Sequence, residues 1–196
     1  GTGNAATVIG LGDAFFANNN GTVSVISNST ANSAATTKID GSSVSSGNIS
    51  LTLKGNTTGT NDTLIGGAGD DTLIIGYKGL AAATTVGLEA ADVFTGNGGN
   101  DTIVLDTQAD GSTAGAGAHT VTIDFDAVTG VEKLEVKDAD GATTAADLVT
   151  VNLAASVTTA NVPAAFEVDG SVKTDADDDL IFNYTNSTTA DNSVLT

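Results

Sequence analysis

The sequence feature that most constrains this chain is a nine-residue motif rich in Gly and Asp. Residues 66–74 (GGAGDDTLI) match every specified position of the pattern Gly-Gly-x-Gly-x-Asp-x-apolar-x. Residues 96–104 (GNGGNDTIV) match it with one change, Asn97 for Gly, and Asn also tolerates left-handed backbone. A repeated motif of this kind predicts similar chain segments that stack on one another.

Four Asp residues indicate how these segments stack. Weaker copies of the motif, around Asp62 and Asp92, precede the two good copies by nine residues. The spacings from Asp62 to Asp92 and from Asp71 to Asp101 are both 30 residues. We therefore expect one enlarged coil of about 30 residues, with an insert near residues 76–86. In this arrangement the loop 66–71 lies against the loop 96–101, and Asp62 lies near Asp92.

The residue types in these loops suit a hard cation such as Ca²⁺. Calcium takes about six to eight oxygen ligands, and a tightly curved loop can offer several backbone carbonyls. The glycines permit the curvature, Asp supplies negative charge, and a second stacked loop completes the shell. The expected ligand residues are Gly66, Gly67, Ala68, Gly69 and Asp71 in the first loop, Gly96, Asn97, Gly98, Gly99 and Asp101 in the second, and Asp62 and Asp92 in the weaker copies.

Other acidic clusters are further candidates for calcium. The strongest is Asp175, Asp177 and Asp179, followed by the pairs Asp124/Asp126 and Asp138/Asp140. None follows the order of an EF-hand loop, and each has the alternative interpretation of a solvated turn. Asp70 and Asn100, which precede the ligand Asp, are expected to face solvent.

The residues around the motif resemble a known family. Residues 57–104 look like the haemolysin-type calcium-binding (RTX) repeats of secreted bacterial proteins. Residues 121–136 are similar to strand-turn-strand stretches of RTX-bearing surface-layer proteins and large adhesins of Gram-negative bacteria. The resemblance implies export, folding outside the cell in millimolar Ca²⁺, and in many members assembly into a surface coat.

Composition narrows the possible functions. The chain has 24 acidic and 6 basic residues and a formal net charge of −18, which argues against nucleic acid or an anionic membrane as partner. It has no Cys, so disulfides, thiolate sites and Cys nucleophiles are excluded. Its one histidine, His119, falls in a Gly/Ala-rich stretch that we expect to be a solvated loop. Aromatic residues are only 4%, too few for the substrate cleft of a typical glycoside hydrolase, and no enzymatic activity is expected.

Alternation of apolar and polar residues predicts a mainly β fold. Strands are expected at residues 22–26, 49–53, 120–125, 133–137, 148–153, 166–172 and 180–184, a turn at 18–21, and a connecting loop at 107–119. The only helix-prone pieces are residues 80–83 and 87–91, both too short to form a helix alone. We expect an N-terminal β region (1–54), a short calcium-binding β-roll or parallel β-helix (55–106), and a C-terminal β region (107–196), with the flanking strands forming a sandwich-like or solenoid structure.

These observations predict a calcium-dependent structural protein of the bacterial cell exterior. Bound Ca²⁺ would neutralise crowded Asp side chains and let copies of the chain pack into a surface layer or filament. The expected partner is the chain itself, with cell-surface polysaccharide as the other candidate, and no membrane insertion. The alternatives are an adhesin module with a structural calcium ion, or the non-catalytic RTX module of a secreted enzyme.

Overall fold

The fold of this chain is mainly β, with strands gathered into parallel sheets. A computed structural model describes residues 7–17, 21–27, 36–54, 62–76, 85–88, 92–106, 118–123, 128–138, 148–153, 166–173 and 179–184. Within these residues there are three sheets, which we call A, B and C, and every strand pairing is parallel. No helix among these residues is long and apolar enough to cross a membrane.

The strands of each sheet follow one another in a fixed spatial order. Sheet A contains β1 (Thr7–Gly12), β3 (Thr37–Ser43), β5 (Thr63–Ile65), β8 (Val93–Thr95) and β11 (Val128–Thr129). Sheet B contains β2 (Thr22–Ser27), β4 (Asn48–Lys54), β6 (Thr72–Gly76), β9 (Thr102–Asp106), β12 (Lys133–Asp138) and β14 (Glu167–Lys173). Sheet C contains β7 (Thr85–Leu88), β10 (Ala118–Ile123), β13 (Leu148–Leu153) and β15 (Asp179–Tyr184).

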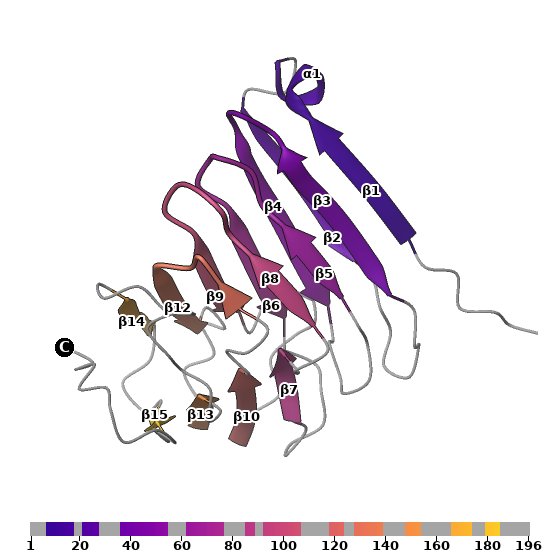
Figure 1. The fold of residues 1–196 in the computed structure, drawn as a ribbon. Coiled ribbons are helices and arrows are strands. Elements are labelled where there is room, and N and C mark those ends of the chain that lie inside the picture. Colours follow the sequence, from indigo (N-terminus) through magenta and orange to yellow (C-terminus); the bar gives the residue numbers. More distant parts are fainter. Residues whose placement is uncertain are drawn as a thin grey trace, which may run out of the picture.

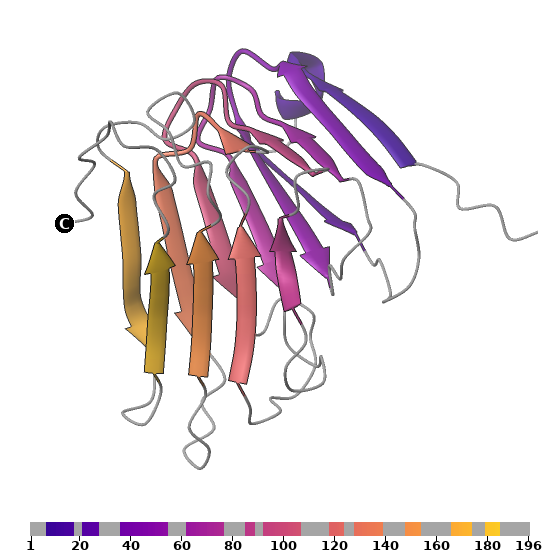
Figure 2. The ribbon, with the colours of Figure 1, turned by 60° about the horizontal axis from the view of Figure 1, so that its bottom comes forward.

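The chain moves from sheet to sheet and advances by one strand each time it returns. The first strands alternate between sheets A and B, and from β5 to β13 the chain visits A, B and C in repeated order. We call one passage from a strand of sheet B to the next strand of that sheet a coil. The coils advance from β1, in indigo, toward β14 and β15, in yellow (Figure 1). Sheet C lies beside sheet B along the later coils (Figure 2).

The core is formed by rows of apolar residues that are register partners on neighbouring strands. In sheet B one inward row runs through Leu51, Leu73, Ile103 and Leu134, all almost completely buried. In sheet A the matching row runs through Ile39, Leu64, Phe94 and Val128. The β-branched and aliphatic residues of these rows suit the inward side of a pleated strand, and both rows belong to one hydrophobic cluster.

The 30-residue coil expected from the Asp spacing is present. Thr72 of β6 pairs with Thr102 of β9, and Thr63 of β5 pairs with Val93 of β8. Each strand predicted from alternation also overlaps an observed strand, whereas strands such as β1, β3 and β7 had no prediction. Sheet B takes strands from residues before 55 and after 106, so it runs through all three predicted regions.

Two predictions about local structure are wrong. Gly87 and Leu88 were assigned to a helix-prone piece but lie in β7, because pairing with β10 outweighs the weak helix preference of a short segment. Ala118 and His119 were assigned to a loop but begin β10, where His119 pairs with Val149. The described helix is instead α1 (Asp13–Phe16), which joins β1 to β2 and buries Phe16. The turn at residue 21 has the positive φ expected of Gly21, 78°.

The row structure predicts a strong contrast between neighbouring positions of β9. We expect Ile103→Ala to lower the free energy of unfolding by about 2–5 kcal/mol, because it opens a cavity in a packed row. The outward neighbour substitution Thr102→Ala should cost about 0.5 kcal/mol, since surface changes are usually small. Urea denaturation followed by circular dichroism measures both, and equal losses would contradict the assignment of Ile103 to the core.

Candidate functional site

The two Gly-rich loops lie directly against each other. The loop 66–71 joins β5 to β6, and the loop 96–101 joins β8 to β9 one coil later. Backbone bonds connect them: Gly66 N–H donates to the carbonyl of Thr95 at 2.7 Å, and Gly98 N–H donates to the carbonyl of Gly67 at 3.2 Å. The Asn97 side chain adds a third bond to the Gly66 carbonyl at 2.7 Å.

Glycine is required in these loops because the carboxylates pack onto the backbone. A Cβ atom added at Gly66 would stand 2.1 Å from Oδ2 of Asp71 and 2.5 Å from the Gly96 carbonyl oxygen. A Cβ at Gly96 would stand 2.1 Å from Oδ2 of Asp101 and 2.0 Å from the Gly130 carbonyl oxygen. No real side chain tolerates such contacts, so each loop closes over its own Asp only when the position is Gly.

The Asp residues of the loops point inward and form a ladder of hydrogen bonds between coils. Asp71 and Asp101 are 0% and 1% exposed. The N–H of Ile49 donates to Oδ1 of Asp71, and the N–H of Asp71 donates to Oδ1 of Asp101, both at 2.7 Å. The N–H of Asp101 donates in turn to Oε2 of Glu132 at 2.7 Å. Each carboxylate thus accepts the amide of the equivalent residue one coil earlier, and we call these residues the sheet B ladder.

A second ladder of the same construction lies at the entry to sheet A. The N–H of Thr37 donates to Oδ1 of Asp62 at 2.7 Å, and the N–H of Asp62 donates to Oδ1 of Asp92 at 2.9 Å. Both carboxylates are buried. Buried amides need acceptors, and a short charged side chain at the entry to a strand supplies a strong one.

The residues next to the sheet B ladder are exposed, as expected. Asp70 and Asn100 lie at the surface. Here the bonds run in the opposite sense, because Asn100 N–H donates to Oδ1 of Asp70 at 2.8 Å and Asp70 N–H donates to Oδ1 of Asn48 at 3.1 Å. Adjacent residues therefore bind adjacent coils through an inner and an outer set of side chains.

The two loops differ at one carboxylate oxygen. Asp71 uses both oxygens, since Gly67 N–H donates to Oδ2 at 2.7 Å. In the second loop the position of Gly67 is taken by Asn97, whose backbone is left-handed with a φ of 74°. Oδ2 of Asp101 is buried and has no hydrogen-bond partner. The Gly-to-Asn difference between the repeats thus coincides with an unsatisfied negative oxygen.

Burial makes ionisation of these carboxylates unfavourable. Burial raises the pKa of Asp71, although the amides of Ile49 and Gly67 oppose the rise. Burial likewise raises the pKa of Asp101 to about 7, opposed by the Asp71 amide and increased by the nearby Asp71 and Glu132 carboxylates. The second loop therefore carries a buried carboxylate whose negative charge is readily neutralised by a proton or by a cation.

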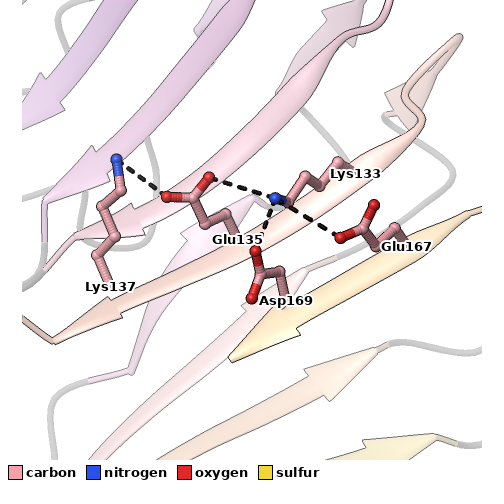
Figure 3. Close-up of polar contacts among 5 residues, drawn as sticks. All are labelled: Lys133, Glu135, Lys137, Glu167 and Asp169. Carbon is pink, nitrogen blue, oxygen red and sulfur yellow. Dashed lines mark hydrogen bonds and ion pairs between the residues drawn. The ribbon is translucent and has the colours of Figure 1, made fainter. Parts of the chain in front are cut away.

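The ion pairs of sheet B lie elsewhere, on its outward face. Figure 3 shows Lys133 of β12 between Asp169 at 2.7 Å and Glu135 and Glu167 at 3.7 Å each. Lys137 pairs with Glu135 at 3.0 Å. The hydrogen bond with Asp169 is the main cause that raises the pKa of Lys133. These residues are partly exposed, so the cluster is a surface network and is distinct from the buried ladder.

The donors in the second loop fit a hard cation only if backbone oxygens take part. Oδ2 of Asp101 and the Gly130 carbonyl oxygen converge on the same side of Gly96. Among the described residues no group of three or more His, Cys, Asp or Glu side chains could hold a metal ion. A calcium ion here would therefore depend on the single charge of Asp101 and on carbonyl oxygens, which calcium accepts readily.

The structure brings some of the predicted site residues together, and others lie outside the residues it describes. Both Gly-rich loops and both Asp pairs come together between coils as the spacing predicted. Asp175, Asp177, Asp124, Asp126 and Asp140 lie outside the described residues, Asp138 ends β12, and Asp179 begins β15, where it pairs with Leu148.

Sequence reasoning missed Glu132, the last carboxylate of the sheet B ladder. Its position, 31 residues after Asp101, continues the coil spacing, but no Gly-rich loop of the motif precedes it. The spacing alone was the available signal.

Comparison of this chain with protein-family models, curated proteins and solved structures gives no match.

The ladder predicts a large difference between two adjacent acids. We expect Asp71→Ala to lower the free energy of unfolding by about 2–4 kcal/mol, because the buried amides of Ile49 and Gly67 lose their acceptor. Asp70→Ala, which removes one exposed acceptor, should cost about 0.5–1 kcal/mol. Guanidinium denaturation in calcium-free buffer tests the pair, and a loss for Asp71→Ala no greater than for Asp70→Ala would refute the ladder as a stabilising element.

The pKa of Asp101 predicts a pH dependence of stability. A carboxyl whose pKa is raised from 3.8 to about 7 on folding contributes stability below pH 3.8, and this is lost as the pH rises through 7. Asp101→Asn should therefore reduce the fall in unfolding free energy between pH 5 and pH 8 by on the order of 2 kcal/mol, since one pKa unit is worth about 1.4 kcal/mol. Denaturation at several pH values in calcium-free buffer measures this, with Asp70→Asn as control. An unchanged pH dependence in Asp101→Asn would exclude the raised pKa.

Proposed function

We propose that this chain is a calcium-dependent structural protein of the bacterial cell exterior that self-assembles into a surface layer or filament. In this proposal the three parallel sheets are the sides of a short solenoid, which resembles an RTX β-roll in the coils that carry the two Gly-rich loops. The parallel pairing of strands about 30 residues apart supports this architecture.

The observation that carries the proposal is the buried carboxylate of Asp101. Its Oδ2 has no hydrogen-bond partner, and the Asp71 and Glu132 carboxylates lie close enough to raise its pKa. A divalent cation would supply the missing positive charge and accept carbonyl oxygens from the glycine-rich backbone. In the first loop Asp71 already has two amide donors, so we propose the loop 96–101 as the principal calcium site.

Calcium binding explains how so acidic a chain can assemble. At a net charge of −18 copies repel one another unless counter-ions are bound. An exterior location supplies calcium at the concentration that weak, carbonyl-rich sites need, since extracellular modules bind at about 10⁻⁴–10⁻³ M. Stability and assembly would then both depend on the medium outside the cell.

A calcium titration tests this function. We expect millimolar CaCl₂ to raise the midpoint of thermal unfolding by several degrees, by preferential binding to the folded state, and equal MgCl₂ to raise it much less. The double variant Asp71→Ala/Asp101→Ala should lose the calcium response, whereas Asp13→Asn/Asp40→Asn, which removes one exposed and one half-buried acid outside the loops, should keep it. An unaltered response in the Asp71/Asp101 variant would overturn the proposed site.

Particle size distinguishes the coat from the alternatives. Light scattering and electron microscopy should show sheets or fibres that grow with added calcium and dissolve in EDTA. A particle that binds calcium and keeps a constant, small size would instead favour an adhesin module or the non-catalytic RTX module of a secreted enzyme.

A further inference from the structure

The net negative charge of this chain is confined to residues 55–196. Residues 1–54 contain two Asp and two Lys and are formally neutral, so the net charge of −18 belongs entirely to residues 55–196. Strands β1 (TVIGLG) and β2 (TVSVIS) contain no charged residue. These two strands are the outermost strands of sheets A and B at the N-terminal end.

The described residues of the N-terminal end leave part of the core incompletely covered. Inward residues of the first coil, Ile9 and Val25, pack on the hydrophobic cluster but are only partly buried. The short helix α1 covers part of this end with Phe16, while the neighbouring Phe15 is exposed. A β-sheet edge without charge, Pro or a bulky cover leaves its N–H and C=O groups ready to pair with another strand.

Two outward positions on the first coil hold apolar side chains, and their register partners on the next coil are polar. Val8 is 68% exposed and Ile26 is 56% exposed. Their partners one coil further in are Lys38 and Thr52. In the part of the chain that the structure describes, these two edge positions therefore carry apolar side chains where the adjacent strand carries polar ones.

The C-terminal end of the sheets is a poor partner for the N-terminal edge strands because its strands carry acidic residues. Strand β14 carries Glu167 and Asp169, and β15 begins at Asp179. Among the described strands, that end presents the last strands of all three sheets, β11, β14 and β15, whereas the N-terminal end presents the first strands of sheets A and B (Figures 1 and 2). Within the strands that the structure describes, the N-terminal end of a second copy offers edge strands of the same two sheets without a charged residue.

We propose that two copies join through their N-terminal ends in a twofold symmetric dimer. A twofold axis through both sheets reverses strand direction, so β1 and β2 meet their counterparts in antiparallel pairs and the partly covered core residues become buried. The inference deepens the proposed function and rests on its self-assembly, because it names one contact between copies. The Gly-rich loops are not part of this contact, and the residues that meet are formally neutral, so the dimer forms with or without calcium even though further assembly of the acidic parts needs counter-ions.

The test introduces charge on the exposed edge. Val8→Lys/Ile26→Lys places like charges across the twofold axis at side chains that are already exposed. The matched control Thr52→Lys/Thr63→Lys adds the same charge to the same two sheets on inner coils. Light scattering coupled to size exclusion, in EDTA and in calcium, should give twice 19.2 kDa in EDTA for the wild type and the control, and 19.2 kDa for the edge variant. A wild-type monomer in EDTA, or an edge variant that still dimerises, would overturn the dimer.

Cross-linking provides a test that keeps the edge sequence almost intact. The chain has no Cys, so a single Ser24→Cys in β2 can be joined to a second copy by a short bis-maleimide without background. Thr72→Cys, which lies two strands further into sheet B in the same row, is the control. We expect a covalent dimer from Ser24→Cys and none from Thr72→Cys, and equal yields would contradict the proposal. The calcium-dependent thermal shift is independent of both tests, so failure of the dimer and failure of calcium binding are separate results.

Discussion

The structure depends on hydrogen bonds between backbone amides and buried carboxylates at the start of the strands. In sheet B the amides of Ile49, Asp71 and Asp101 each donate to a carboxylate on the following coil. Coils that stack in parallel must satisfy the amides of the connecting loops, where the regular sheet pairing has not yet begun. An acidic side chain solves this problem at each coil, at the cost of burying negative charge.

Burial of charge then determines what the site can do. Asp71 is compensated by two amide donors, whereas Asp101 retains an oxygen without a partner and a pKa raised to about 7. The difference accompanies the change from Gly to Asn in the second repeat, where the Asn97 side chain donates to the carbonyl of Gly66 in the previous loop. One repeat is therefore chiefly structural, and the other is the better candidate for a cation.

The sequence predicted the coil spacing and the stacking of the loops because both are marked by a motif that repeats along the chain. Asp residues 30 positions apart and glycines at fixed offsets leave few ways to place the chain. The sequence could not show that the carboxylates of the four Asp residues accept hydrogen bonds from backbone amides of the preceding coil. The first donor of each ladder, Thr37 or Ile49, belongs to no motif. Strand β7 was missed for a related reason: its pairing with β10 joins residues 35 positions apart, and no local pattern in Thr85–Leu88 reports it.

Amide hydrogen exchange tests the central claim most directly, because it reports on the ladder bonds one at a time. The account predicts that the amides of Ile49 and Asp71 exchange at rates close to those of global unfolding, while the exposed loop amide of Gly99 exchanges rapidly. It also predicts that Asp101→Ala accelerates exchange of the Asp71 amide far more than exchange of the core amide of Leu51. Rapid exchange of Ile49 and Asp71 in the wild type, or no selective effect of Asp101→Ala, would contradict a ladder of buried carboxylates as the element that holds the coils together.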